Sequence, residues 1–334
     1  MSFKLLNIVA CAAIAFVATS LPVSAQTVLK VGHFATGSDA FSETVNAFAA
    51  EVEARSAGHL KVQVYPAGQL GNEKQQISAL QGGLQELLIT TTTNLTNMSE
   101  PLRLLDLPFV FGSYADADAV TMSDTGAKLL SGLEEANLVG LALWDNGFRS
   151  FTNNKRPITT PDDMKGLAMR VISAPVFIDT FSALGAQPVP MPFPEVYSAL
   201  ETGTIDGQDN PALTVEMLKF YEVQGYLTVS NHMYSAMVVL ASKPFLDSLT
   251  PEDRKVLEDV AVDFGPIQRK MVRAAADKAV ETLEHERGMK VVRELTADQL
   301  AAFRAAVEPV VAKTVTDNLR PLYDEMVLKT QSSK

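Results

Sequence analysis

The chain has one cysteine among its 334 residues, Cys11, and that residue lies in the apolar N-terminal stretch. The rest of the chain therefore contains no disulfide bond. Tryptophan occurs once, and the four histidines never stand at metal-ligand spacing from one another. The motifs of serine hydrolases, dinucleotide-binding folds and phosphate-binding loops are missing. These absences argue against an enzyme, a metal site and a resident cofactor.

Positive charge is also scarce. Lysine and arginine number 28 against 39 aspartates and glutamates, which gives a formal net charge of −11. No basic run offsets this charge, so the composition argues against nucleic acid and anionic membrane surfaces as partners. An anionic ligand would need local positive charge that works against the field of the whole chain.

The N-terminal stretch has the composition of an export signal. Lys4 is the only charge in residues 1–25, an apolar run follows it, and small residues end at Ala25. This pattern predicts a secretory signal peptide that is cleaved before Gln26, and hence a periplasmic protein. The apolar run is too short for a membrane span, which needs about 20 residues. A buried N-terminal helix is the alternative.

The rest of the chain alternates between the periodicities of strands and helices. "VLKVGHF", from Val28, and "HLKVQVY", from His59, alternate as half-buried strands, and an amphipathic helical pattern lies between them. This alternation predicts an α/β class with largely parallel sheets. A helical pattern runs from Pro251 to about Arg287, and Gly265-Pro266 predicts a kink or join within it.

An arginine inside an apolar run gives the strongest hint of function. "KGLAMRVISAP" reads as a buried strand, yet it contains Arg170, and Arg149 stands near the end of another strand. Arginine forks match carboxylates bidentately, and Asn210 can add a donor, so one interpretation is a carboxylate clamp. The other interpretation is a pair of structural salt bridges, with candidate partners Asp162, Asp163 and Asp179.

The chain resembles the extracytoplasmic solute-binding proteins of TRAP transporters, the DctP-type family. The stretches that carry this resemblance occur in the order typical of the family and run through the whole mature chain: "LKVGH", "VYPAGQLGNE", "LLDLPFVF", "GFRSFTNNKRPI", "DMKGLAMRV", "LGAQPVPMPFPEVYSALETGTIDGQDNP" and "SNHMYS". The resemblance implies a two-domain periplasmic binding protein fold of the α/β class, with a hinge-joined cleft and a long helix spanning both domains. We expect residues 26–146 plus 235–274 in domain 1, and 147–234 plus 275–334 in domain 2.

The resemblance also assigns residues to the cleft. Arg170, in "MRV", matches the family's main carboxylate partner, Arg149 matches a second contact and Asn210 a third. Phe193, in the "MPF" turn, matches an aromatic residue that lines the cleft.

The opposite wall is expected to hold Phe34, Glu73 and Thr91, at positions that decide how the rest of the ligand is bound. A bridging metal would have Gln208 or Asp209 as candidates, but none is expected. The family usually has glutamate where this chain has Asp209, a change that leaves the arginines in place.

The resemblance implies a binding protein that does no covalent chemistry. We expect a monomer that captures a sugar acid or hydroxy acid, or a C4-dicarboxylate, by its carboxylate and delivers it to TRAP transporter membrane subunits. The threonines and Glu73 favour a ligand with hydroxyl groups. A sensory protein that feeds a chemoreceptor is the alternative, and an exported hydrolase is a further one.

Overall fold

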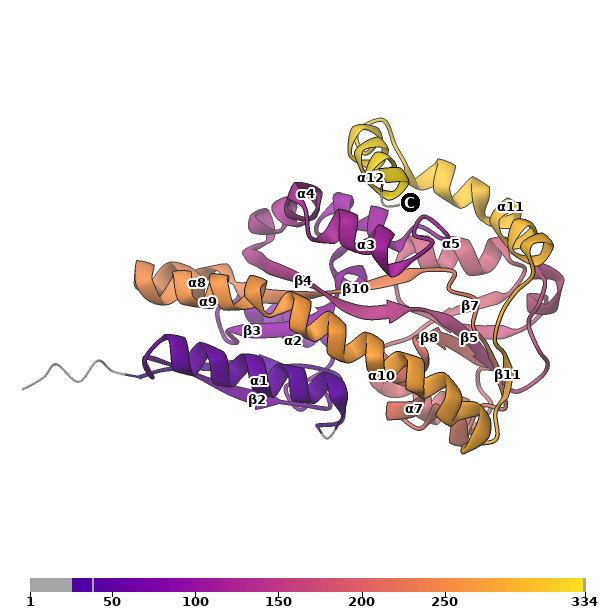
Figure 1. The fold of residues 1–334 in the computed structure, drawn as a ribbon, viewed down its shortest axis with the longest axis horizontal. Coiled ribbons are helices and arrows are strands. Elements are labelled where there is room, and N and C mark those ends of the chain that lie inside the picture. The colour runs from indigo at the N-terminus through magenta and orange to yellow at the C-terminus, as the bar shows by residue number, and fades with distance from the viewer. Residues whose placement is uncertain (1–25, 38, 333–334) are drawn as a thin grey trace, which may run out of the picture.

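The computed structural model describes residues 26–37 and 39–332, which form two lobes around two β-sheets (Figure 1). The predicted signal peptide and Cys11 lie outside the described residues. In the part of the chain that the structure describes, no helix combines the length and apolar character that crossing a membrane requires.

The first sheet has five strands in the order β2-β1-β3-β10-β4. Its strands are β1 (Thr27–Gly32), β2 (Leu60–Tyr65), β3 (Leu87–Thr91), β4 (Leu138–Phe148) and β10 (Tyr234–Ser242). β1 pairs in parallel with β2 and β3, whereas β10 runs antiparallel to both β3 and β4.

The second sheet has six strands in the order β11-β9-β5-β8-β6-β7. Its strands are β5 (Ser150–Asn153), β6 (Ala168–Val171), β7 (Gln187–Pro190), β8 (Gly207–Asn210), β9 (Tyr226–Thr228) and β11 (Lys290–Val292). β6 pairs in parallel with β7 and β8, but β5 runs antiparallel to β8 and β9. Both sheets are therefore mixed, because the strands next to the lobe crossings run against their neighbours.

Helices cover both sheets. Those that pack in the lobe of the first sheet are α1 (Ala40–Arg55), α2 (Glu73–Gln81), α3 (Tyr114–Thr121), α4 (Asp124–Leu130), α8 (Lys243–Ser248) and α9 (Pro251–Asp263). The second lobe contains α5 (Pro175–Ala183), α6 (Val196–Glu201), α7 (Ala212–Met217) and α11 (Ala297–Thr314). Short 3₁₀ helices are η1 (Thr92–Leu95), η2 (Glu100–Asp106), η3 (Ser131–Ala136), η4 (Pro161–Met164), η5 (Phe193–Glu195) and η6 (Phe220–Glu222).

The helix starts follow their capping residues. Asp39 caps α1 by accepting a hydrogen bond from the Ser42 amide, and Thr250 does the same for Asp253 in α9. The α1 face predicted to be apolar is buried: Val45, Phe48, Ala49 and Val52. This burial stabilises the helix against the first sheet.

The chain crosses between the lobes where strands of the two sheets follow each other directly. β4 of the first sheet leads into β5 of the second with only Arg149 between them, and the Arg149 amide bonds the Met233 carbonyl just before β10. The two crossings are therefore hydrogen-bonded side by side, which is the geometry of a hinge.

A long helical segment runs across both lobes (Figure 1). α9 ends at Asp263, Phe264 joins it to α10 (Gly265–His285), and this join confirms the interruption predicted at Gly265-Pro266. α10 contacts α1 and β4 of the first lobe as well as α7 and β11 of the second. The expected helix spanning both lobes is therefore present.

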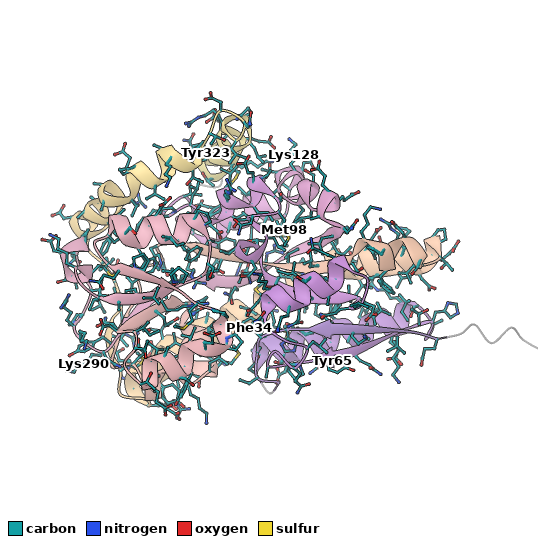
Figure 2. All side chains as sticks on the ribbon, turned by 180° about the vertical axis from the view of Figure 1, so that it is seen from behind. Phe34, Tyr65, Met98, Lys128, Lys290 and Tyr323 are labelled. Carbon is teal, nitrogen blue, oxygen red and sulfur yellow. The ribbon has the colours of Figure 1, made fainter. Side chains whose placement is uncertain are left out.

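The last helix, α12 (Arg320–Ser332), lies over α3 and α4 of the first lobe (Figures 1 and 2). Met326 is buried in the core of that lobe, and Glu325 pairs with Lys128 at 2.7 Å. The chain thus returns to the first lobe after α11, whereas the expected second domain extended to the C-terminus.

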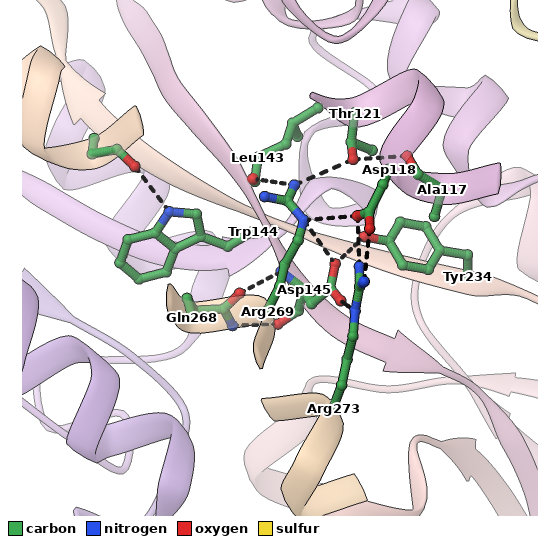
Figure 3. Close-up of polar contacts among 11 residues, drawn as sticks. Ala117, Asp118, Thr121, Leu143, Trp144, Asp145, Tyr234, Gln268, Arg269 and Arg273 are labelled. Carbon is green, nitrogen blue, oxygen red and sulfur yellow. Dashed lines mark hydrogen bonds and ion pairs between the residues drawn. The ribbon is translucent and has the colours of Figure 1, made fainter. Parts of the chain in front are cut away.

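Polar groups fix α10 to β4 (Figure 3). Gln268 exchanges two hydrogen bonds, of 2.8 and 2.7 Å, with the backbone of Asp145 in β4. The buried Asp145 carboxylate pairs with Arg273 at 2.6 Å and with Arg269 at 3.5 Å. Asp118 in α3 pairs with both arginines. This cluster places α10 against the strand that leads into the hinge.

Replacing Asp145→Asn should lower the free energy of unfolding by about 3–5 kcal/mol, because it leaves the buried guanidinium of Arg269 short of a counter-charge. Urea denaturation measures this change. The control is Asp162→Asn, since Asp162 forms an ion pair in which its side chain is 80% exposed, and that variant should stay within about 0.5 kcal/mol of the parent. Equal losses in the two variants would contradict the anchoring role.

Candidate functional site

A cavity of about 520 Å³ lies between the lobes, and residues of both lobes line it. Every residue predicted for the site is part of its lining: Phe34, Glu73, Thr91, Arg149, Arg170, Phe193 and Asn210. The first three come from the first lobe, Arg149 lies at the crossing, and the others belong to the second lobe. The structure therefore brings all the predicted residues to one place, of a size typical of small-molecule sites.

Arg149 is buried and already paired. Its Nε lies 2.5 Å from Asp209 Oδ2, its Nη2 bonds the Asp209 carbonyl, and its guanidinium lies over the Phe177 ring. Asp209 reaches Arg149 because β5 and β8 place it opposite Phe151. The salt-bridge interpretation thus applies to Arg149 with a different carboxylate from the candidates, since Asp162 pairs with Lys165 and Asp179 with Lys313.

The third candidate partner, Asp163, is also engaged elsewhere. Its carboxylate accepts hydrogen bonds from the amides of Thr159 and Thr160, which close the η4 turn. These amides and the threonine hydroxyls outweigh partial burial and lower the pKa of Asp163.

Asp209 holds a second buried group. His232 Nε2 lies 3.3 Å from Asp209 Oδ2, and Nδ1 lies 2.8 Å from the Ser230 hydroxyl. Burial works to raise the pKa of Asp209, but Arg149 and His232 outweigh it and hold that pKa well below its usual range. Burial also lowers the pKa of His232, which is therefore neutral. Among the described residues, Asp209 is the carboxylate that forms an ion pair with Arg149.

Arg170 has a different environment. It is 3% exposed, and its Nε and Nη2 donate to the Met191 carbonyl at 3.1 and 2.8 Å. Across residues 26–37 and 39–332, no carboxylate forms an ion pair with it. Burial, helped by Arg149, lowers the pKa of Arg170 to about 10, so the group keeps its charge at neutral pH. A buried, unneutralised guanidinium thus stands in the cavity wall.

Asn210 ends β8 beside the arginines. It is buried, and its Nδ2 donates to Gln208 Oε1, while Gln208 donates to Thr152 at 2.8 Å. The side chains of Gln208 and Asp209, named as candidates for a bridging metal, therefore bond to protein groups, and neither residue lines the cavity. The described residues hold no cluster of three or more His, Cys, Asp or Glu side chains suited to a metal ion.

An aromatic pair joins the two walls. Phe34, which follows β1, and Phe193 in η5 meet edge to face with ring centroids 5.6 Å apart. Figure 2 shows Phe34 where the lobes face each other. Phe193 also lies beneath the Arg170 guanidinium, 5.6 Å from its ring centroid. The pair therefore covers Arg170 on one side and connects the lobes across the cleft.

Sequence reasoning missed several polar residues of the cavity wall, among them Lys74, Asn94 and Asn146. Asn94 donates to the hydroxyls of Thr90 and Thr91 at 2.9 and 3.2 Å. Its position after the carboxyl end of β3 is a signal that could have revealed it. Asn146 lies one residue beyond Asp145 in β4, and no sequence signal marks it as a residue of the cavity wall.

A buried acid lies behind the arginines. Asp106, at the end of η2, accepts a hydrogen bond from Thr93 at 2.8 Å through Oδ1, and Oδ2 has no partner among the described residues. Burial raises the pKa of Asp106 to about 7, and Asp209 adds to the rise, although Thr93 and Arg149 oppose it. This acid therefore titrates near neutral pH.

The proton of Asp106 links stability to pH. Between about pH 4 and pH 7 the folded chain holds a proton that the unfolded chain has lost, so this residue makes stability fall as pH rises. Asp106→Asn keeps the Thr93 bond and removes the titration. The variant should match the parent near pH 4 and exceed its unfolding free energy by on the order of 4 kcal/mol at pH 8.

Urea denaturation at several pH values tests this expectation, with the exposed Asp162→Asn as control. Parallel stability curves for Asp106→Asn and the parent would rule out a buried proton at Asp106.

Comparisons with known proteins agree with this geometry. The 2,3-diketo-L-gulonate-binding periplasmic protein YiaO of Escherichia coli is 36% identical over 80% of this chain and 81% of that protein. The C4-dicarboxylate-binding periplasmic protein DctP of Rhodobacter capsulatus is 35% identical over 88% of each. The sugar acid binding protein DctPAm of Advenella mimigardefordensis, solved with galactonate, superposes with a TM-score of 0.88 at 34% identity, covering 92% of this chain and 99% of that one.

Residues 31–318 match the model of a single family, described as bacterial extracellular solute-binding protein, family 7. The match covers most of the chain, and the relatives above align over at least four fifths of it. The chain therefore belongs to the family 7 bacterial extracellular solute-binding proteins.

Proposed function

We propose that this protein is the solute-binding subunit of a TRAP transporter and captures a small organic acid by its carboxylate. The observation that carries the proposal is Arg170, a buried guanidinium in the cavity wall that no carboxylate of the described residues neutralises. A buried charge is stable only when it is paired and hydrogen-bonded. A ligand carboxylate supplies that missing pair.

The arrangement around Arg170 suits a carboxylate. Two of its nitrogens bond Met191, which fixes the plane of the guanidinium, and Nη1 has no partner among residues 26–37 and 39–332. Arg149 has its Nε and Nη2 on Asp209 and also lines the cavity. Arg170 is thus the main electrostatic partner, while Arg149 and Asn210 add donors. Charge-assisted bonds of this kind strengthen when closure excludes water.

The ligand is a sugar acid or hydroxy acid, or a C4-dicarboxylate. The ligands of the relatives support this range, since they include galactonate, 2,3-diketo-L-gulonate and C4-dicarboxylates. The cavity supports it too, because an arginine wall faces threonines, Asn94 and Glu73. Hydroxyl groups of a ligand can donate to Glu73 and bond to the threonines.

Closure follows from the hinge. Rotation about the paired crossings at Arg149 and Met233 brings Phe34 onto Phe193 and seals the cavity. The closed protein then docks on the membrane subunits, opens and releases the ligand unchanged.

The protein acts as a monomer in the periplasm after loss of residues 1–25. The first residue of the purified periplasmic protein should therefore be Gln26 or its cyclised form.

A serine, a histidine and an aspartate form a hydrogen-bonded chain, Ser230–His232–Asp209, which invites comparison with a hydrolase triad. None of the three lines the cavity, and all are buried. Their observed role is to hold Asp209 against Arg149, so this geometry does not favour the hydrolase alternative. A sensory role would use the same cleft. Co-purification tells the two roles apart, because a transport protein should co-purify with membrane subunits and a sensory protein with a chemoreceptor.

Replacing Arg170→Ala should weaken binding of the carboxylate ligand by roughly 30-fold to several-thousand-fold, the equivalent of about 2–5 kcal/mol. Isothermal titration calorimetry with galactonate and with succinate measures the affinity. The control, Arg304→Ala, removes an exposed arginine from α11 of the same lobe and should leave the affinity unchanged. If Arg170→Ala binds as tightly as the parent, Arg170 is a structural residue.

A further inference from the structure

The charged side chains that line the cleft interact differently with different organic acids. The cationic side chains in its lining are those of Arg149, Arg170 and Lys74, and the anionic one is that of Glu73. Asp209 offsets Arg149 through a buried ion pair in which both side chains are at most 1% exposed. Lys74 is exposed, so solvent and salt screen its charge. One buried cation, Arg170, therefore remains uncompensated.

Glu73 faces that cation from the opposite lobe. It is the first residue of α2, directly after the Asn72 cap, and it lines the same cavity as Arg170 of β6. The two charges act on each other across the cavity, since Glu73 is among the groups that raise the pKa of Arg170 against burial. A helix start also favours a negatively charged side chain at this position.

Apart from the exposed Lys74, the other described residues of the first-lobe wall offer no cation to a ligand. His33 is buried, and burial lowers its pKa to about 4, so it is neutral at the pH of the periplasm. Thr91 and Thr90 accept hydrogen bonds from Asn94, which leaves their hydroxyl protons and the Asn94 carbonyl oxygen for other bonds. Neutral donors and acceptors of this kind match the hydroxyl groups of a ligand.

We infer that the cleft prefers monocarboxylic acids with a hydroxylated remainder to C4-dicarboxylates, and that Glu73 sets this preference, which rests on the proposed capture of one carboxylate by Arg170. The carboxylate of the ligand pairs with Arg170, and its hydroxyl groups donate to Glu73. A second carboxylate would have to approach Glu73 in a closed, water-poor cleft. Like charges placed together in this way repel each other strongly, which weakens binding.

Sequence identity does not decide between the two ligand classes. The diketogulonate-binding relative is 36% identical and the C4-dicarboxylate-binding relative 35% identical to this chain. The cavity charges of this chain do separate the classes, because Glu73 attracts hydroxyl donors and repels a second anion.

Calorimetry at pH 7.5 with galactonate and succinate tests the inference on the parent protein and on Glu73→Gln. The parent should bind galactonate at least about 100-fold more tightly than succinate, a difference of about 2.7 kcal/mol. Glu73→Gln keeps the side chain's shape and removes its charge. It should weaken galactonate binding and strengthen succinate binding, so that the ratio of the two affinities falls by about tenfold or more.

Glu43→Gln is the matched control. Glu43 is also an acid in the first turn of a helix, α1, but it does not line the cavity. The control variant loses the same charge at a helix start, so it should keep the parent ratio of affinities. It separates the local effect of Glu73 from the change in net charge.

Two outcomes overturn the inference, and they can be told apart from failure of the proposed function. If the parent binds succinate as tightly as galactonate, or if Glu73→Gln leaves the ratio within about twofold, Glu73 does not select the ligand. Carboxylate capture would still stand in both cases, provided that Arg170→Ala abolishes binding. If neither acid binds the parent, the proposed function fails as well.

Discussion

The site depends on one imbalance: two buried arginines line the cleft, and among the described residues only Arg149 forms an ion pair with a carboxylate. Asp209 neutralises Arg149 and is itself steadied by His232, whereas Arg170 bonds only a backbone carbonyl and lies over Phe193. A carbonyl dipole and an aromatic face lower the energy of a buried cation but do not cancel its charge. If Arg170 captures a carboxylate as proposed, water around the guanidinium stabilises the open cleft and the bound anion stabilises the closed one. Ligand capture and lobe closure are coupled by this requirement.

The hinge allows such closure because the long helix is held differently by the two lobes. Towards the first lobe, α10 makes directional contacts, with Gln268 on the Asp145 backbone and Arg273 on two carboxylates. Towards the second lobe it packs through apolar side chains of the shared core, and Glu281 and Glu284 near its end form ion pairs with Arg293, just after β11, that are partly exposed to solvent. Hydrogen bonds fix a register, while apolar packing tolerates small displacements. The buried polar contacts of α10 with the first lobe thus hold it more firmly than its partly exposed ion pairs with the second.

Much of the fold was predictable from local pattern, because capping residues and apolar periodicity act within a few positions. The starts of α1 and α9, the break at Gly265-Pro266 and the strand around Arg170 all follow from such signals. The partner of Arg149 could not be predicted from local pattern, because Asp209 becomes its neighbour only through the antiparallel register of β5 and β8. The packing of α12 on the first lobe likewise depends on contacts between residues far apart in the sequence. The resemblance to a known family, rather than spacing, supplied the opposite wall of the cleft, and neither predicted Asn94 or Asn146.

The charges around the cleft also affect how the ligand is released. Asp209 offsets Arg149, Glu73 lies across the cavity from Arg170, and the chain as a whole carries a formal net charge of −11, which opposes the approach of a distant anion. Long-range attraction therefore contributes little to affinity. Most of the affinity must come from short-range hydrogen bonds that exist only in the closed form. Such bonds are lost together when the lobes separate, because water then solvates Arg170 and competes for each donor. A binding protein built in this way holds its ligand firmly when closed and gives it up when a partner opens it.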